Sequence, residues 1–388
     1  MRILVDQSGY ELLNLGDVAM LQVCVSQLQN LWPNADIDVL TRSPERLEQY
    51  CAGATAVNPD LDPRKSRPQR RSASCGRSSH PRRLLAALWR ADLVVSSGGG
   101  FINDIFWWHG VRVLNLLGLA QQLGKPTAMF SQGIGPLTHP RLSRMVRRVM
   151  PRLLVVGLRE GRGSAAMLTA RRVGQQLIQV TGDDALLVAT APTRSSTGTN
   201  IGLNMRVAPY SEIDGNVASR AGAVAVDSGR CRGVSTLPMP VSRYHSAYDL
   251  DAIQTCRATD APNGSLHNSD DILSPEELAE RAARCRVVVT ASYHAAVFAL
   301  AAGVPAVCVT NSRYYDLKFE GLSTQFPGGC HIVRPGADFE RDLAGAIDRA
   351  WQADESERDQ IHSAAKAQVA QVNQIYARFK SLVDATAA

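Results

Sequence analysis

The chain has 388 residues, of which 45% are hydrophobic and 20% are charged, and its formal net charge is +6. A chain of this length is too long to fold around one ordinary hydrophobic core, which predicts two domains of comparable size. No apolar run approaches the length of a membrane span, about 18 residues, and Met1 to Asp6 lacks the features of a secretory signal, which predicts a soluble, cytoplasmic protein. The eight cysteines never approach Cys-x-x-Cys spacing, so we expect reduced packing residues and no metal site.

The first half of the chain alternates short β-branched runs with helical patterns, which is typical of βαβ units on a parallel sheet. Residues 1–189 are therefore expected to form an N-terminal Rossmann-like domain. Its strands are expected over residues 3–5, 37–40, 93–96, 127–130, 153–157 and 177–180. Its helices are expected over residues 18–31, 111–123, 141–150 and 163–172.

A Ser/Pro-rich stretch, residues 58–83, interrupts this domain and predicts a mobile basic loop. Such a loop is suited to nucleic acid, anionic lipid or an anionic substrate, and a solvated linker explains it equally well. No aromatic residue lies between its basic residues, which argues against single-stranded nucleic acid as the partner. The basic residues are Arg64, Lys65, Arg67, Arg70, Arg71, Arg77, Arg82 and Arg83.

The stretch TAPTRSSTGT, residues 190–199, breaks the alternation and predicts an interdomain linker. Residues 200–388 restart it and predict a second Rossmann-like domain with a helical tail. Ser274 and Glu277 form a capping box for a helix expected over residues 275–285. The expected fold is α/β, with two parallel sheets that face a cleft and bind ligands at their carboxyl ends. The expected strands of this half cover residues 200–204, 222–227, 233–238, 287–290 and 306–309.

Two clusters at strand ends of the first half are candidates for ligand binding. In NLGDVAM, residues 14–20, Asp17 would occupy a helix N-cap. In SSGGGFIND, residues 96–104, three glycines would let backbone N–H groups approach an anion. A tight turn without any ligand is the alternative explanation of the glycines. They are Gly98, Gly99 and Gly100.

Charged side chains end three further strands. Arg159 in GLREGRGS and the acids Asp183 and Asp184 in TGDDA follow neighbouring strands, which indicates either a bound polar ligand or a structural ion pair. Arg206 is the last residue of the tripeptide Asn-Met-Arg, residues 204–206, at the end of the first strand of the second half, and it is expected to point into the cleft.

A histidine opens the apolar helix that follows the strand at residues 287–290. His294 lies in the first turn of that helix, where free backbone N–H groups create a positive potential. An imidazole there can bind a phosphate or act as a general acid or base, and a core histidine is the alternative. The next strand is followed by TNSRYYDLKFEGL, which places Tyr314 and Lys318 nearby.

Together, NLGDVAM, VVSSGGGFIND, FSQGIGPL, LREGRGSAAML, VTGDDALLV, GLNMRVAPYS and SYHAAVFALAAGVPAV resemble the polysaccharide pyruvyl transferase family over roughly residues 1–329. The resemblance implies a GT-B-like fold of two Rossmann-like domains. It also implies transfer of the enolpyruvyl unit of phosphoenolpyruvate to a sugar, usually as a ketal. His294 matches the family histidine proposed as acid/base, and Arg159 matches a motif arginine. Ser292 stands where many members carry an arginine two residues before that histidine.

The main hypothesis is therefore pyruvyl transfer from phosphoenolpyruvate, as a co-substrate without any cofactor, to hydroxyls of a glycan or glycan precursor. His294 is the candidate acid and base, and Asp17 would orient or deprotonate the acceptor hydroxyl. The candidate donor-binding residues are Gly98, Gly99, Gly100, Arg159, Arg206, Ser292, Tyr293 and Lys318. The candidate acceptor-binding residues are Asn14, Asn103, Trp107 and Tyr314.

Two alternatives remain open at this point. A GT-B glycosyltransferase with a nucleotide-sugar donor would share the fold and cleft, and the serine at position 292 favours it slightly. A non-catalytic glycan-binding relative would keep the fold without turnover. The expected partners are a small-molecule donor and a glycan; nucleic acid is not expected, and peripheral membrane contact stays open.

Overall fold

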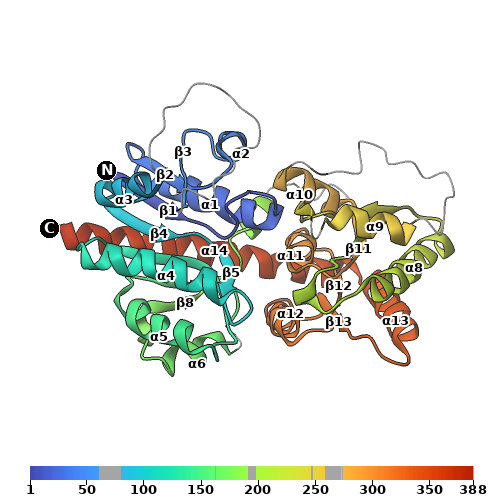
Figure 1. Cartoon of the computed structure of the whole chain (residues 1–388). Coiled ribbons are helices and arrows are strands. Elements are labelled where there is room, and N and C mark those ends of the chain that lie inside the picture. The colour runs from blue at the N-terminus through green and yellow to red at the C-terminus, as the bar shows by residue number, and fades with distance from the viewer. Residues whose placement is uncertain are drawn as a thin grey trace.

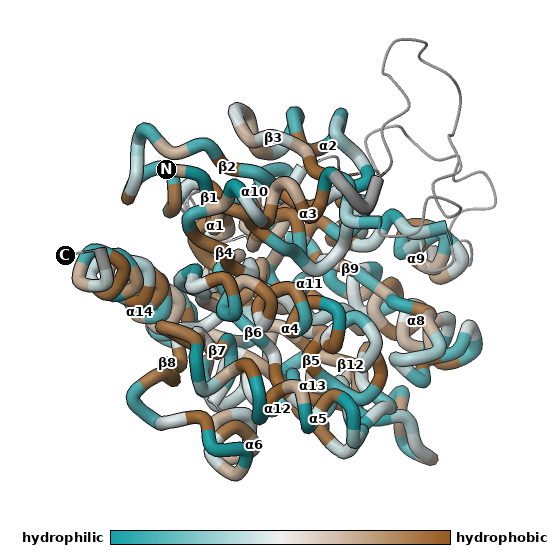
Figure 2. Tube along the Cα trace, turned by 60° about the vertical axis from the view of Figure 1, so that its left-hand side comes forward, coloured by the Kyte–Doolittle hydropathy of each residue, from teal (hydrophilic) through white to brown (hydrophobic). Residues whose placement is uncertain are grey.

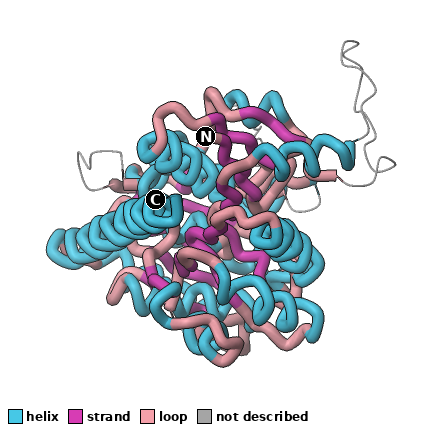
Figure 3. Tube along the Cα trace, turned by 90° about the vertical axis from the view of Figure 1, so that its left-hand side faces the viewer, coloured by secondary structure: helices cyan, strands magenta, loops and turns pink. Residues whose placement is uncertain are grey.

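The computed structural model of the protein consists of two α/β units, which Figure 1 shows beside each other, the N-terminal one in blue and green and most of the C-terminal one in yellow and orange. Figure 3 shows the strands running through the middle of the molecule with helices on both sides. The structure describes residues 1–60, 80–161, 163–190, 198–245, 248–257, 272 and 274–387.

Among the described residues, the first sheet has eight parallel strands in the order β3-β2-β1-β4-β6-β7-β8, with β5 paired to β6. Neighbouring side chains of β1 point to opposite faces, so Leu4 packs in one core and Ile3 and Val5 in another. The strands are β1 (Arg2–Asp6), β2 (Asp36–Leu40), β3 (Thr55–Val57), β4 (Leu93–Ser96), β5 (Gly99–Ile102), β6 (Thr127–Ile134), β7 (Val156–Leu158) and β8 (Ile178–Val180). The helices are α1 (Leu15–Leu31), α2 (Pro44–Tyr50), α3 (His80–Arg90), α4 (Trp107–Gln122), α5 (Pro140–Val149), α6 (Ser164–Thr169) and α7 (Leu186–Ala189), with short 3-10 helices at Met150–Arg152 and Gln175–Leu177.

The second sheet has five parallel strands in the order β10-β9-β11-β12-β13 within the described chain. In Figure 2 the hydrophobic residues, in brown, gather along the strands and the helices packed on them. The strands are β9 (Asn200–Asn204), β10 (Thr236–Pro238), β11 (Cys285–Thr290), β12 (Ala306–Val309) and β13 (Cys330–Val333). The helices are α8 (Gly215–Cys231), α9 (Asp249–Arg257), α10 (Pro275–Ala283), α11 (Tyr293–Ala301), α12 (Arg313–Gln325), α13 (Phe339–Gln352) and α14 (Glu355–Ala387), with a 3-10 helix at Pro209–Ser211.

The C-terminal helix α14 connects the two units. It starts beside the second unit and runs along the first, as the red helix of Figure 1 shows. Tyr376 stacks on Phe130 of β6 with ring centroids 4.0 Å apart, and Phe379 lies 5.5 Å from the same ring. The bounds 1–189, 190–199 and 200–388 stay a prediction, and residues 191–197 lie outside the described residues.

The strand predicted over residues 222–227 is wrong, because these residues form the middle of helix α8. The Ala/Val pattern there is compatible with the repeat of a helix and with that of a strand. Asp214 caps the helix by accepting a hydrogen bond from the backbone N–H of Val217. Gly222 lets α9 approach closely, because a Cβ atom at this position would lie 2.1 Å from Cys256 Cβ. Close helix packing in three dimensions therefore decides the conformation of this segment.

Three smaller expectations also change. Residues 80–83, assigned to the basic loop, belong to helix α3, while residues 61–79 lie outside the described residues. Cys285 starts β11 and does not end the preceding helix. Gly99 and Gly100 belong to strand β5 and do not form an open turn. None of the helices in the described part of the chain combines the length and apolar character that a membrane crossing needs.

Candidate active site

A cavity of about 410 Å³ opens on both units, at the carboxyl ends of their strands. This is the place where open parallel sheets bind ligands. Of the residues predicted from the sequence, the cavity wall includes Asn14, Asp17, Gly100, Arg159, Arg206, Ser292, Tyr293, His294, Tyr314 and Lys318. The wall also includes Ser8, Gly9, Tyr10, Glu11, Arg42, Phe101, Phe106, Trp108, His109, Tyr210, Ser242, Tyr244 and Tyr315.

His294 lies in the first turn of α11 and contacts the first turn of α1 from the other unit. A Cβ atom at Gly16 would lie 2.0 Å from His294 Cγ, so the imidazole fits there because residue 16 has no side chain. The residue is 7% exposed, and its Nε2 lies 3.7 Å from Asp183 Oδ2. Nε2 is buried and has no hydrogen-bond partner among the described residues. The ring is therefore packed at the cavity wall, and the described residues leave the hydrogen-bonding capacity of this nitrogen unused.

Arg159 follows β7 and is almost fully buried. Its Nη1 lies 3.7 Å from Asp183 Oδ2, and its guanidinium carbon lies 4.3 Å from the centroid of the Tyr293 ring. Cβ atoms at Gly100 and Gly133 would lie 2.5 Å and 2.6 Å from its Nη2. Gly100 therefore makes room for this guanidinium. The Nε and Nη2 atoms have no hydrogen-bond partner in the described part of the chain.

Lys318 projects from α12 into a group of tyrosines. Its Nζ lies 3.8 Å from the ring centroid of Tyr314 and 5.1 Å from that of Tyr315, and it contacts the Tyr314 hydroxyl. The Tyr314 hydroxyl lies 3.0 Å from the carbonyl oxygen of Gly100, to which it donates. This bond links α12 of the second unit to β5 of the first. Lys318 therefore stands where the two units meet.

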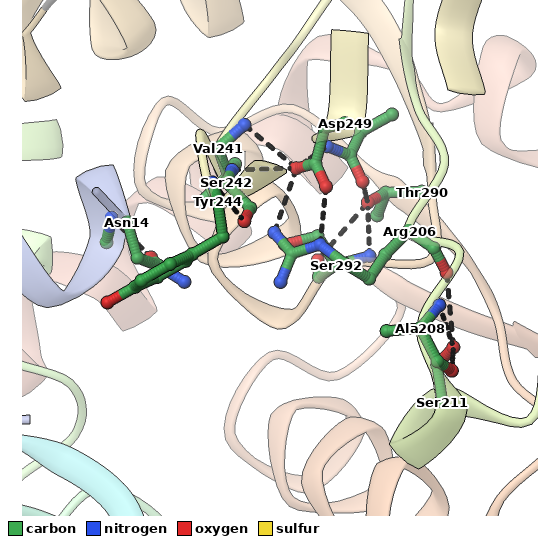
Figure 4. Close-up of polar contacts among 12 residues, drawn as sticks. Asn14, Arg206, Ala208, Ser211, Val241, Ser242, Tyr244, Asp249, Thr290 and Ser292 are labelled. Carbon is green, nitrogen blue, oxygen red and sulfur yellow. Dashed lines mark hydrogen bonds and ion pairs between the residues drawn. The ribbon is translucent and has the colours of Figure 1, made fainter. Parts of the chain in front are cut away.

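Arg206 lines the cavity, but its charge is compensated. Its Nη2 donates to Asp249 Oδ2 at 2.8 Å and its Nε contacts the other carboxylate oxygen of Asp249. Figure 4 shows Asp249 between this guanidinium and the backbone N–H groups of Val241 and Ser242, which donate to it at 2.9 Å each. Ser292 Oγ lies 3.4 Å from Arg206 Nη2. The arginine predicted as an anion ligand is thus held in a buried ion pair at the wall.

Asp17 is not the N-cap predicted from the sequence. Asn14 caps α1 instead: its Oδ1 accepts from the N–H groups of Gly16 at 3.0 Å and Asp17 at 3.3 Å. The Asp17 carboxylate faces the cavity, where burial raises its pKa to about 6 against the opposing charges of Arg159 and Lys318. A proton is therefore held by Asp17 at a higher pH than by an exposed aspartate.

Four predicted residues are not at the cavity wall. Gly98 backs onto Met20, and Gly99 adjoins Phe101 within its strand. Asn103 accepts at Oδ1 from two backbone N–H groups, those of residues 105 and 106, at 2.9 Å each. Trp107 stacks on His139 with ring centroids 4.1 Å apart. The neighbouring Trp108 is at the wall instead.

Burial and the neighbouring positive charges disfavour protonation of His294. Burial, followed by Arg159 and Lys318, holds the pKa of His294 well below its usual value. Burial and Arg159 likewise hold the pKa of Lys318 well below the ordinary lysine value. Both groups therefore lose their protons at a lower pH than an exposed histidine or lysine does. A bound anion would favour the charged form of each and oppose both shifts.

The sequence matches the polysaccharide pyruvyl transferase family over residues 14–313, which is most of the chain. The chain belongs to this family. Membership in the polysaccharide pyruvyl transferase family makes the protein a transferase enzyme. A comparison with curated proteins gives no significant match.

Solved structures share the GT-B-like fold at low sequence identity. A putative UDP-N-acetylglucosamine 2-epimerase from Listeria monocytogenes aligns with a TM-score of 0.62 and 12% identity, covering 99% of this chain and 96% of that one. HepE from Anabaena, in complex with UDP and glucose, gives 0.59 and 14%, covering 97% and 98%. The UDP-GlcNAc 2-epimerase from Neisseria meningitidis, bound to UDP-GlcNAc, gives 0.60 and 10%, covering 98% and 99%. These similarities establish the fold of this polysaccharide pyruvyl transferase family member.

Proposed function

We propose that the protein transfers the pyruvyl group of phosphoenolpyruvate to hydroxyls of a glycan or glycan precursor. One observation carries this proposal: Arg159 and Lys318 meet His294 in one cavity, and Arg159 Nε and Nη2 have no partner among the described residues. Family membership supports it independently. A buried guanidinium with unused donors is suited to the carboxylate or phosphate of such a donor molecule.

The cationic groups suggest how the donor is held. Phosphoenolpyruvate carries a carboxylate and a phosphate on the same carbon. Arg159 can donate two parallel hydrogen bonds to one of these groups, while Lys318 offers a point charge to the other. Ser292 adds the N-terminal end of α11, whose backbone N–H groups favour an anion. Arg206 is paired with Asp249 and would fix Ser292 and shape the wall.

His294 would carry out the proton transfers. Binding of the anion raises the pKa of His294, so the imidazole takes up a proton. It then delivers this proton to the methylene carbon of the enol phosphate, while an acceptor hydroxyl attacks the adjacent carbon, and the neutral imidazole accepts the proton of that hydroxyl. A second hydroxyl then bonds to the same carbon as the bond between this carbon and the phosphate oxygen breaks. The proton of the second hydroxyl passes to the departing phosphate, so that a ketal and inorganic phosphate result. Asp17, at the same wall, is placed to orient the attacking hydroxyl.

Phosphate release from phosphoenolpyruvate in the presence of a panel of glycan acceptors tests this function. His294→Asn should lower kcat by about 10²- to 10⁴-fold, the range of general acid–base catalysis. His331→Asn is the matched control, because His331 lies on β13 and outside the cavity wall. If the His294 variant releases phosphate at the wild-type rate, the assignment of the imidazole is wrong. If the wild type releases none with any acceptor, the donor is wrong.

Glycosyl transfer from a nucleotide-sugar is the second candidate. Two observations favour it: Ser292 stands where an arginine would hold a small dianion, and HepE, of similar fold, is described in complex with UDP and glucose. Thermal unfolding with UDP, GDP or phosphoenolpyruvate separates the two, because a ligand that binds only the folded state raises the melting temperature. Stabilisation by a nucleotide and none by phosphoenolpyruvate would favour this candidate over pyruvyl transfer.

A further inference from the structure

We propose that the wall around His109 is a binding site for an uncharged sugar ring, and that this ring is the acceptor end of the substrate. The second half of this statement rests on the proposed function, while the first half does not. The site consists of His109, Tyr10, Phe101 and Trp108, together called the aromatic wall. All four line the cavity, and all belong to the first unit.

His109 is the polar centre of this wall. It is 6% exposed and lies on α4 among three rings. Its ring centroid is 4.7 Å from that of Phe101, 5.4 Å from Tyr10 and 5.5 Å from Trp108. Its Nε2 is buried without a hydrogen-bond partner among the described residues, although the side chain is at the cavity wall. Buried polar atoms are normally paired, so this atom offers a hydrogen-bonding position to a group bound in the cavity.

The imidazole is a neutral group. Burial, with the charges of Arg112 and Arg42, lowers the pKa of His109 to about 4. A neutral imidazole offers one hydrogen-bond donor and one acceptor, which matches a hydroxyl and gives little attraction to an anion. The pKa of His294 is likewise lowered first by burial, but the cations that lower it further, Arg159 and Lys318, line the cavity themselves.

The arginine that lines the cavity at the aromatic wall, Arg42, is already compensated, and Arg112, which lies 4.8 Å from the centroid of the Tyr10 ring, is not part of the cavity wall. The guanidinium of Arg42 donates to Asp60 at two atoms, with Nε–Oδ2 at 2.9 Å and Nη2–Oδ1 at 2.7 Å. Its Nη1 also lies 3.3 Å from Glu11 Oε1. Glu11 faces the cavity as well, and its carboxylate would repel an acidic sugar. Phosphate or carboxylate binding is therefore disfavoured at this wall.

Trp108 supplies a flat apolar surface at the rim. Its side chain is among the large hydrophobic groups that remain exposed, at 55%, although the residue lines the cavity. Sugar rings have apolar C–H faces and hydroxyl edges. An exposed indole beside a buried, neutral hydrogen-bonding group therefore matches an uncharged sugar better than it matches a planar anion.

Binding of three methyl glycosides tests the site without any donor. We would titrate the protein with methyl β-galactoside, methyl N-acetylglucosaminide and methyl glucuronide and follow Kd by saturation-transfer difference NMR. At least one uncharged glycoside should bind more tightly than the glucuronide. His109→Phe, which keeps the ring and removes Nε2, should weaken its binding about tenfold, and His109→Gln should restore part of the affinity. Thermal unfolding checks that each variant is folded.

Neighbouring tryptophans provide the matched control. Trp108→Ala should weaken binding of the uncharged glycoside, while Trp107→Ala should not, because Trp107 stacks on His139 away from the cavity wall. Any one of four results would overturn the sugar site. In the variants, these are wild-type affinity in His109→Phe or an equal loss of affinity in both tryptophan variants. In the wild type, they are tighter binding of the glucuronide or no binding of any glycoside. Glycoside binding without phosphate release from phosphoenolpyruvate would instead overturn the proposed function and leave the sugar site standing.

Discussion

Two buried histidines line the same cavity, and their surroundings differ. His294, on the second unit, lies beside Asp183 and lines the cavity together with Arg159, whose Nε and Nη2 atoms have no hydrogen-bond partner among the described residues. His109, on the first unit, lies among aromatic rings, and the arginine at its wall is already paired with Asp60. Both pKa values are lowered, mainly by burial. The direction of the pKa shift is therefore the same for both histidines, and what separates them is the charges that line the cavity beside each ring.

The largest effect is expected when the free charge of the His294 wall is removed. Arg159→Gln should lower kcat/KM for phosphoenolpyruvate by about 10³-fold, because a buried, preorganised donor to a developing charge contributes about 10²- to 10³-fold and the change also leaves Asp183 without its cation. Phosphate release under steady-state conditions measures this. Arg220→Gln is the control, since Arg220 forms an exposed pair with Glu340. A loss of sugar affinity without loss of donor affinity in Arg159→Gln would contradict the division between the walls.

A second effect is expected from a residue that touches no ligand. Gly16→Ala would place a Cβ atom 2.0 Å from His294 Cγ, so the imidazole must move. We expect kcat to fall about 10²-fold, at the lower end of what loss of a general acid and base costs. Gly215→Ala is the matched control, because a Cβ atom there meets nothing within 4 Å. Normal turnover in Gly16→Ala would mean that the position of the His294 ring does not matter.

Local patterns in the sequence predict the inner strands of both sheets because hydrophobic runs and strand ends are local features, but they miss β3, β5 and β13. The parallel order then brings strand ends to one edge, which is why Arg159, Arg206 and His294 share a cavity. Partners distant in sequence are not predictable in this way. Asp249 compensates Arg206 across 43 positions, and no pattern announces the pair.

The phase of a helix limits the prediction in a different way. The sequence places the start of a helix at residue 111, whereas α4 begins at Trp107. The start and the packing of α4 decide that Trp108 and His109 line the cavity while Trp107 stacks on His139. His109 follows no strand and belongs to no motif, so neither spacing nor composition singles it out. The burial of its Nε2 is visible only in three dimensions.

The smallest expected effect is the pH dependence of donor binding. Burial and Arg159 hold the pKa of Lys318 well below its usual value, and that of His294 is lowered too. A bound anion is expected to raise both, so that the complex holds more protons than the free protein. The affinity for phosphoenolpyruvate should therefore fall as the pH rises, by up to about tenfold per pH unit when one proton is taken up.

Calorimetry distinguishes the two walls by this proton uptake. The protein would be titrated with phosphoenolpyruvate above about pH 7.5, where a phosphate with a second pKa of about 6 is fully ionised. Comparing the binding enthalpy in buffers of different ionisation enthalpy should then show proton uptake. Asp17, whose pKa burial raises to about 6, titrates below this window. Lys318→Met should bind more weakly and lose much of the pH dependence. In this range the pH is far above the pKa of His109, so its imidazole is neutral and binding of an uncharged glycoside should take up no proton. Proton uptake on glycoside binding would mean that both walls respond to charge in the same way.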